Sequence, residues 1–308
     1  MAGSGHVGRF APSPTGRLHI GSLLAAVASC CDARHHGGEW LVRMEDLDPP
    51  REVAGAADDI LRTLEGFGFE WDREVWFQST RDEVYRAALA ALTSGGFCYP
   101  CGCSRKDWSE HTVYPGTCRE GLAAGAEGRM QRFRLEEGAM AWHDEFLGEQ
   151  SFQADTLGDF PLLRADGYWA YQLAVVVDDR SQGVTHVIRG ADLLDSTPRQ
   201  MRVWEALSQV TDPIPCARYG HLPILTNAAG QKLSKQTLAR PVELAEACVL
   251  VDAVWGWLGQ DRSEAWMAAM ASGDSRAMLT EGIRLWNRSR VPAGSIQLQG
   301  WGQDERPA

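Results

Sequence analysis

The feature that most constrains the fold is a strand-like segment that runs through a rigid turn into a helix. Residues 6–11 are strand-like, residues 12–17 contain two prolines and a glycine, and residues 18–34 have the small and apolar side chains of a packed helix. A strand followed at once by a helix is the opening unit of an α/β fold. The amino end of such a helix has unpaired N–H groups and attracts phosphate.

Composition places the chain among globular proteins. Its 308 residues are 44% apolar and 23% charged, which suits one large α/β domain with insertions, or two domains. The net charge of −11 argues against binding polyanions over the whole surface, although a local basic stripe can still bind RNA. We find no secretory signal and no apolar run long enough for a membrane span, so we expect a cytoplasmic protein that binds neither membranes nor DNA.

The pattern of strands and helices predicts a parallel sheet with an insertion. A buried strand at residues 40–44 ends in an acidic, proline-terminated turn, and helices are expected at 52–66 and 80–93. The pattern resumes at residues 168–173, 175–179 and 186–192, after a segment rich in glycine, cysteine and charge. We divide the chain into a first half of the core, an insertion, a second half of the core and a short helical end, at residues 1–97, 98–160, 161–240 and 241–308. In the last part, residues 242–258 and 264–286 are expected to be helical, and 291–308 loosely ordered.

Two short motifs predict a nucleotide site. His19 can donate to a phosphate oxygen, while Gly21 lets an adenine or ribose lie against the backbone next to Ser22. More than two hundred residues later, Lys232 and Lys235 lie in a turn-rich segment and can neutralise a leaving pyrophosphate. Taken alone, the first motif is better explained as an exposed histidine at a helix start, and the second as an exposed basic loop. Their joint occurrence favours an ATP site.

These segments resemble the class I aminoacyl-tRNA synthetases of the glutamate type. The first signature of that family matches with serine in its last position, and the second matches with Gln236 in place of the usual serine. The resemblance covers roughly residues 5–240 and is carried by residues 9–16 with 19–22, 43–48, 188–192 and 232–236. It implies a Rossmann-like catalytic core that uses ATP with Mg²⁺.

The resemblance also implies how the amino acid is bound. L-Glutamate has two carboxylates and an ammonium group, so its pocket needs guanidinium groups and an anion. Arg9 and Arg189 suit the carboxylates, Glu45 the ammonium, and Tyr171 a hydroxyl contact or a ring wall, although each is equally suited to a salt bridge or a core position. The complete set matching the family's glutamate contacts is Arg9, Phe10, Ala11, Pro12, Ser13, Glu45, Tyr171 and Arg189.

The carboxyl end of the chain departs from this family. Only 72 residues follow Gln236, too few for the helices next to the core and an anticodon-binding domain as well. The chain therefore resembles the truncated paralogues called glutamyl-queuosine tRNA(Asp) synthetases. That resemblance implies activation of glutamate without tRNA, followed by transfer to the queuosine base of tRNA(Asp). Rival interpretations are a glutamyl-tRNA synthetase that charges the 3′-terminal adenosine, a small-molecule nucleotidyltransferase and a non-catalytic RNA-binding paralogue.

The insertion contains a candidate zinc site. Cys101, Cys103 and Cys118 lie within 18 residues, which in a reducing compartment favours a metal site over disulfides. Ligand chemistry alone favours His111 as the fourth ligand, the resemblance implies Tyr114, and Cys98 is a third possibility. With four protein ligands the Zn²⁺ would be structural. The alternative is three loop thiols without a metal.

Overall fold

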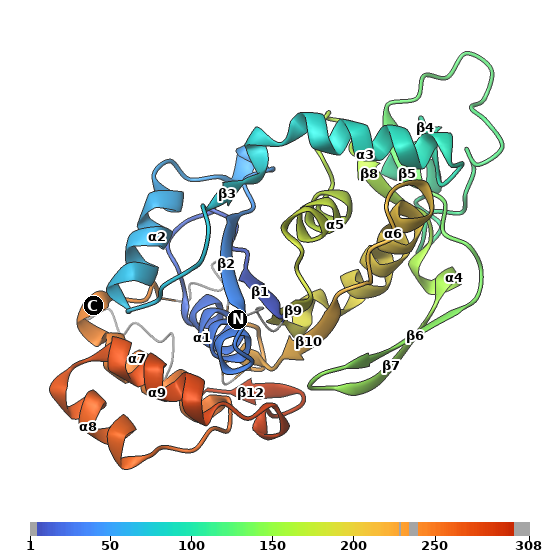
Figure 1. Ribbon diagram of the computed structural model, residues 1–308. Coiled ribbons are helices and arrows are strands. Elements are labelled where there is room, and N and C mark those ends of the chain that lie inside the picture. The colour runs from blue at the N-terminus through green and yellow to red at the C-terminus, as the bar shows by residue number, and fades with distance from the viewer. Residues whose placement is uncertain (1–4, 228, 234–239, 299–308) are drawn as a thin grey trace.

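The computed structural model describes residues 5–227, 229–233 and 240–298. Its centre is a seven-stranded sheet in the order β3-β2-β1-β9-β10-β6-β7 (Figure 1). Neighbouring strands are parallel as far as β6, and β7 is antiparallel to β6. The strands in that order are Trp76–Phe77, Glu39–Met44, Val7–Phe10, His186–Gly190, Arg218–Leu222, Ala139–Asp144 and Gly148–Gln153. The predicted parallel α/β core is confirmed.

Apolar clusters cover both faces of this sheet. In β2, Trp40, Val42 and Met44 belong to one cluster, whereas Leu41 belongs to the other, because successive side chains of a strand point to opposite faces. The first cluster includes α1 (Ile20–His35) and α7 (Ala247–Trp257), and the second includes α5 (Tyr171–Gln182) and α6 (Thr197–Val210). Figure 1 shows the α7 region beside α1.

The remaining elements are short or peripheral. β4 (Cys98–Cys101), β5 (Met130–Phe133) and β8 (Phe160–Leu163) form a separate antiparallel sheet, and β11 (Ile224–Thr226) pairs with β12 (Ser295–Gln297). Further helices are α2 (Ala56–Gly66), α3 (Asp82–Ser94), α4 (Ala154–Leu157), α8 (Glu264–Ser272) and α9 (Ser275–Leu285). Single 3-10 turns are η1 (Pro49–Arg51), η2 (Gln78–Thr80), η3 (Arg105–Trp108), η4 (Ala191–Ser196), η6 (Leu244–Glu246) and η7 (Arg288–Arg290).

Four predicted segments have a different form in the structure. The stretches at 168–173 and 175–179 do not form separate elements, because a single helix, α5, begins at Tyr171 within the first and continues through the second. The helical stretch 264–286 is divided into α8 and α9, since Gly273 has a φ of 75° and Asp274 caps α9. Residues 295–297, expected to be loosely ordered, form β12, and residues 299–308 lie outside the described part of the chain.

The division of the chain into four parts stays a prediction. Strands β6 and β7 come from the predicted insertion and extend the large sheet, whereas β4, β5 and β8 form the smaller one. Among the described helices, none combines the length and apolar character needed to cross a bilayer.

Candidate active site

A cavity of about 1020 Å³ opens where β1, β2 and β9 end. Ligands of α/β proteins bind at this edge of the sheet. The cavity is lined by every predicted ATP-site and glutamate-site residue within the described part of the chain. These are Arg9, Phe10, Ala11, Pro12, Ser13, His19, Gly21, Ser22, Glu45, Tyr171, Arg189 and Lys232. Lys235 lies outside the described residues.

The turn after β1 is held in place by backbone hydrogen bonds. The Pro12 carbonyl accepts from the amide of Glu45 at 2.9 Å, and the Pro14 carbonyl accepts from the amide of Val53 at 3.0 Å. The rigid turn therefore joins the end of β1 to the segment that follows β2. This connection fixes the position of the α1 amino terminus relative to Glu45.

His19 caps the amino terminus of α1. Its Nδ1 accepts a hydrogen bond from the Gly21 amide at 3.2 Å, and its Nε2 lies 3.2 Å from the Ser22 hydroxyl. In the neutral ring, an accepting Nδ1 leaves the hydrogen on Nε2. A Cβ on residue 21 would lie 3.2 Å from the His19 ring, so glycine allows this close approach. The imidazole and the positive end of the helix dipole face the cavity, and a phosphate bound there would compete with Ser22 for the Nε2–H.

Lys232 reaches the same cavity from the distant lysine loop. Its ammonium pairs with the carboxylate of Asp192, which lies in η4 directly after β9. The backbone of Leu233 is tied to Leu225 in β11 by a hydrogen bond of 2.8 Å. The two motifs that are distant in the sequence therefore border one space.

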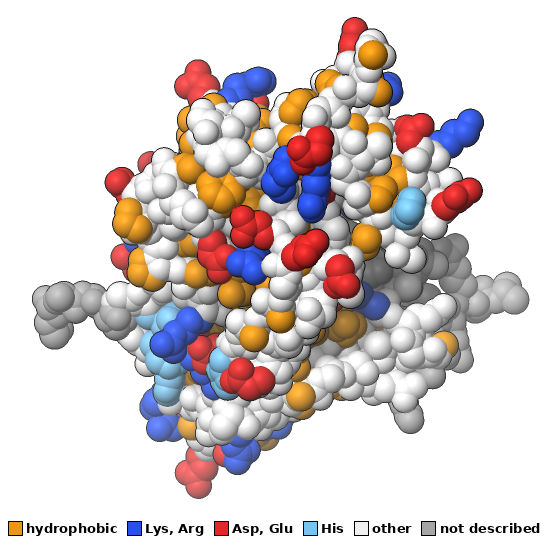
Figure 2. Space-filling model, turned by 90° about the vertical axis from the view of Figure 1, so that its right-hand side faces the viewer, with side chains coloured by type: hydrophobic (Ala, Val, Ile, Leu, Met, Phe, Trp, Pro, Cys, Tyr) orange, Lys and Arg blue, Asp and Glu red, His pale blue; other side chains and the backbone are white. Residues whose placement is uncertain are grey.

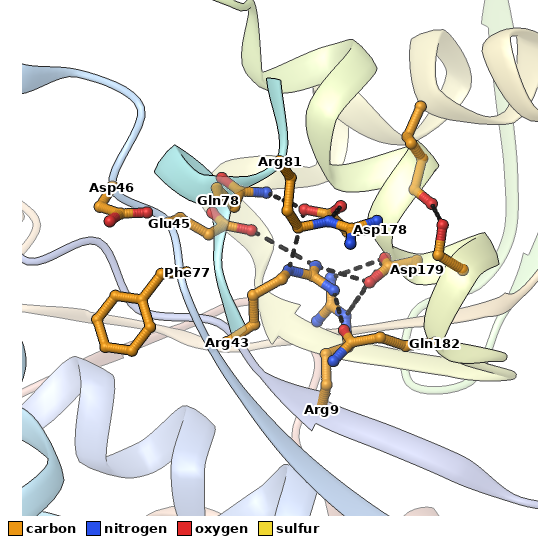
Figure 3. Close-up of polar contacts among 12 residues, drawn as sticks. Arg9, Arg43, Glu45, Asp46, Phe77, Gln78, Arg81, Asp178, Asp179 and Gln182 are labelled. Carbon is orange, nitrogen blue, oxygen red and sulfur yellow. Dashed lines mark hydrogen bonds and ion pairs between the residues drawn. The ribbon is translucent and has the colours of Figure 1, made fainter. Parts of the chain in front are cut away.

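Two arginines and an aspartate form a buried network under the cavity (Figure 3). Arg9 donates to Asp179 through Nε at 3.2 Å and Nη2 at 3.3 Å, and Arg43 donates to it at 2.7 Å. Burial opposes ionisation of Asp179, but the two guanidinium groups hold its pKa below the usual range. One edge of the Arg9 guanidinium is therefore bonded to Asp179, so fewer of its N–H groups remain for the predicted bond to a ligand carboxylate.

The neighbouring Asp178 anchors the same helix to η2 and α3. It is fully buried and accepts from Gln78 at 2.8 Å, Tyr85 at 2.7 Å and Arg81 at 2.5 Å. Figure 3 shows Gln78 and Arg81 directed toward it. None of these four residues was predicted from the sequence.

Glu45 supplies a carboxylate at the cavity wall. One of its oxygens is buried and accepts no hydrogen bond from the described residues, and its closest charged contact is Arg43 at 3.7 Å. Burial raises the pKa of Glu45 to about 7, although Arg43 and Arg9 act in the opposite direction. A carboxylate with spare hydrogen-bonding capacity suits an ammonium ligand.

Tyr171 and Arg189 lie together on the other side of the cavity. Arg189 is 5% exposed and donates through Nη1 to the Tyr171 hydroxyl at 3.1 Å. It also donates to Gln200 at 2.8 Å, Thr197 at 2.8 Å and His221 at 3.2 Å. The two predicted residues are therefore in contact, and several unpredicted polar groups hold the guanidinium.

The three predicted thiols cluster away from this cavity, at the ends of β4 and β5. The sulfur atoms of Cys101, Cys103 and Cys118 lie within 4.8 Å of one another. The Tyr114 hydroxyl lies 3.4 Å from the Cys101 sulfur and 3.7 Å from the Cys103 sulfur. Burial opposes ionisation of Cys118, but the hydrogen bond from Tyr114 helps to lower its pKa to about 7.

The two rival fourth ligands are not part of this cluster. The thiol of Cys98 contacts the Thr93 hydroxyl at 3.1 Å, and His111 is an exposed residue outside the group of thiols. Three thiolates suit Zn²⁺, whereas a phenol as the fourth ligand follows from the resemblance and not from ligand chemistry. Tyr114 is therefore the predicted fourth ligand that the structure places beside the sulfur atoms.

Comparisons with known proteins show the family to which the chain belongs. The sequence model described as tRNA synthetases class I (E and Q), catalytic domain, matches residues 7–247. A Glutamyl-Q tRNA(Asp) synthetase from Chromobacterium violaceum is 52% identical over 313 residues, which covers 97% of this chain and 99% of that protein. One from Neisseria meningitidis serogroup B is 53% identical over 303 residues, covering 94% and 99%.

A solved structure supports the fold. The glutamate-tRNA synthetase from Elizabethkingia anophelis superposes with a TM-score of 0.78 at 22% identity, over 96% of this chain and 68% of that one. The fold and the family match define a class I tRNA synthetase of the glutamate and glutamine type, which is a ligase. Within that class, the chain belongs to the family of Glutamyl-Q tRNA(Asp) synthetases.

Proposed function

We propose that this enzyme activates L-glutamate with Mg-ATP in the absence of tRNA, and then transfers the glutamyl group to the queuosine base at the wobble position of tRNA(Asp). The observation that carries the proposal is a single cavity that combines the histidine-capped start of α1 with two arginines and a carboxylate. The names of relatives at about half identity support glutamate and the modified tRNA as substrates. Because tRNA is a cytoplasmic substrate, we place the reaction in the cytoplasm.

In this proposal, glutamate lies between Glu45 and Arg189. The ionised Glu45 binds the ammonium group, while Arg189 and the Tyr171 hydroxyl bind a carboxylate. Arg9 contributes the part of its guanidinium that Asp179 does not occupy. The walls of this pocket are completed by Phe10, Ala11, Pro12 and Ser13.

The first step forms glutamyl-adenylate. An oxygen of the α-carboxylate attacks the α-phosphorus of ATP, the bond from that phosphorus to the bridging oxygen breaks, and pyrophosphate leaves. His19 donates to a phosphate oxygen, Gly21 and Ser22 border the nucleotide, and Lys232 with Lys235 offset the growing charge on pyrophosphate. Mg²⁺ enters with ATP and neutralises phosphate charge. Holding both reactants in one cavity supplies much of the rate increase.

The second step transfers the glutamyl group. A hydroxyl oxygen of the modified base attacks the carbonyl carbon of the adenylate, AMP leaves, and an ester is formed. The tRNA must be bound through local contacts, because acidic and basic side chains are interspersed on the face that Figure 2 shows. The net charge of −11 likewise argues against binding of the tRNA over the whole surface.

We further propose a structural Zn²⁺ bound by Cys101, Cys103, Tyr114 and Cys118. These residues come from the end of β4 and the loop that leads to β5. A bound ion would join this loop to the small sheet. It would add stability there, because only a small cluster of apolar side chains packs in this region.

The test has two stages. The wild-type enzyme is expected to catalyse ATP–pyrophosphate exchange that requires glutamate but no tRNA; an enzyme without any exchange would be a non-catalytic paralogue. Labelled glutamate is then supplied with tRNA(Asp) that contains or lacks queuosine, and a nuclease digest locates the label. We expect label only in the anticodon-loop fragment of the queuosine-containing tRNA. Label on the terminal adenosine, independent of queuosine, would identify an ordinary glutamyl-tRNA synthetase.

A further inference from the structure

The charge of Arg189 is buried without a carboxylate partner. Its hydrogen-bond partners are the neutral groups of Tyr171, Gln200, Thr197 and His221, together with the Leu193 carbonyl at 3.3 Å, and its Cζ lies 5.3 Å from the centre of the Tyr219 ring. Within the described part of the chain, Arg189 forms no ion pair, whereas Arg9 and Arg43 share Asp179. Buried charges in proteins are normally paired, so a guanidinium left unpaired at a cavity wall is prepared for an anionic ligand.

A histidine and an aspartate hold this arginine across three adjacent strands. Arg189 in β9 lies directly opposite His221 in β10, and Asp144 ends the next strand, β6. His221 Nδ1 lies 2.5 Å from Asp144 Oδ2, and both side chains are fully buried. The other oxygen of Asp144 accepts from the backbone amides of His221 at 3.0 Å and Phe146 at 3.1 Å. The carboxylate therefore has one fixed orientation.

This orientation determines which nitrogen of His221 carries the hydrogen. A carboxylate only accepts hydrogen bonds, so Nδ1 of His221 donates to Asp144. Nε2 is then an acceptor that faces the Arg189 Nε–H at 3.2 Å and the Thr197 hydroxyl at 3.0 Å. Burial also lowers the pKa of His221, although Asp144 acts in the opposite direction, and a neutral ring results. The neutral imidazole separates Asp144 from Arg189 while fixing the guanidinium plane.

We propose that Asp144 and His221 are positioning residues that orient Arg189 toward the side-chain carboxylate of glutamate, without neutralising its charge. The inference rests on the proposed function, since it takes glutamate as the substrate. The side-chain carboxylate is the appropriate ligand because the α-carboxylate must attack phosphorus, and an ion pair with a fixed guanidinium would weaken that nucleophile. A directly paired carboxylate in place of His221 would compete with the substrate for Arg189. By leaving Arg189 charged and oriented, Asp144 and His221 therefore determine selectivity for glutamate over glutamine.

Asp144→Asn tests this arrangement with a nearly isosteric change. The backbone amides still require an oxygen, so the new NH₂ group faces His221 Nδ1 and makes it an acceptor. The hydrogen moves to Nε2, which can then donate to the Thr197 oxygen but no longer accepts from the Arg189 Nε–H. We expect the KM for glutamate to rise roughly ten- to hundred-fold. The KM for ATP should stay within about twofold, and selectivity over glutamine should fall because glutamine has no carboxylate for Arg189.

The matched control is Glu149→Gln in the same hairpin. Glu149 pairs with His143 at 2.7 Å, but both side chains are largely exposed and neither lines the cavity. This variant should keep wild-type constants for both substrates. Unchanged glutamate constants in Asp144→Asn, or an equal loss with glutamate, glutamine and ATP, would overturn the inference. An inactive wild-type enzyme would instead refute the proposed function.

Two substitutions of His221 cover the case in which Asp144→Asn does not fold. A glutamine oxygen can take the place of Nε2, whereas leucine has no acceptor. Selectivity for glutamate that is retained in His221→Gln and lost in His221→Leu supports the inference. The same selectivity in both variants contradicts it.

Discussion

Glutamate binding is expected to depend on pH through Glu45. The carboxylate lies at the cavity wall, and burial raises its pKa to about 7. In the proposed function, only the ionised form attracts the substrate ammonium, and the ammonium and carboxylates of glutamate titrate outside the range from pH 6 to 8. Raising the pH through 7 should therefore strengthen glutamate binding.

The size of the effect follows from the pKa. A group with a pKa near 7 is about 9% ionised at pH 6 and about 91% ionised at pH 8. If only the ionised form binds glutamate, the KM for glutamate falls about tenfold between these two pH values. The assay is glutamate-dependent ATP–pyrophosphate exchange at saturating ATP, with the KM for ATP measured at each pH as the internal control.

Stability should change with the opposite sign. The folded-state pKa of Glu45, about 7, lies above the unfolded value of 4.5, so the folded protein binds this proton more tightly. The contribution to stability is therefore present below pH 4.5 and is lost as the pH rises to 7, at a cost of up to about 3 kcal/mol. Glu45→Gln removes the ionisable group, so the variant should unfold at higher urea concentration than wild type at pH 8.

Two results would refute this reasoning. A KM for glutamate that is constant from pH 6 to 8 in the wild-type enzyme would mean that Glu45 does not bind the ammonium. A Glu45→Gln variant that retains the wild-type KM for glutamate and its pH dependence would lead to the same conclusion. A parallel change in the KM for ATP would assign the titration to the nucleotide site.

Three further substitutions test the buried network, the thiol cluster and the lysine loop. Asp179→Asn leaves Arg9 and Arg43 without their shared anion and should cost roughly 3–5 kcal/mol in urea unfolding at neutral pH; a loss below about 1 kcal/mol would show that the two charges are compensated elsewhere. Cys101→Ser should lower the zinc content measured by atomic emission, and unchanged metal content would exclude the proposed site. Lys235→Ala should abolish glutamate-dependent exchange, and near-normal exchange would remove this lysine from the mechanism.

The sequence predicted the parts of the fold that depend on local patterns. The β1 strand, its proline-rich turn and α1 follow directly along the chain, and the residues needed for the helix cap are close together. The motif residues that line the cavity were predictable for the same reason, together with a resemblance to a known family. The lysine motif was assigned to the same site from its joint occurrence with the first motif and from the resemblance, because nothing local connects residue 232 to the helix start.

The buried charge network could not be predicted in the same way. Asp178 and Asp179 follow three valines that have the composition of a strand, but in α5 they reach β1, β2 and α3. Two adjacent acidic residues in an apolar segment were the available signal, since buried carboxylates need cationic partners. His221 and Asp144 are 77 residues apart, and their contact depends on the order of strands β6 and β10.

The charges around the proposed amino-acid site explain why glutamate, and not glutamine, suits it. With Glu45 ionised, the negative charges of Glu45, Asp178 and Asp179 balance those of Arg9, Arg43 and Arg81. Arg189 has no directly contacting carboxylate among the described residues, because the neutral His221 separates it from the buried Asp144. Glutamate, with two carboxylates and one ammonium, brings a net charge of about −1, whereas glutamine is neutral overall. Glutamine would leave the Arg189 guanidinium without a contacting carboxylate in a buried site, and this electrostatic cost opposes its binding even where its shape fits.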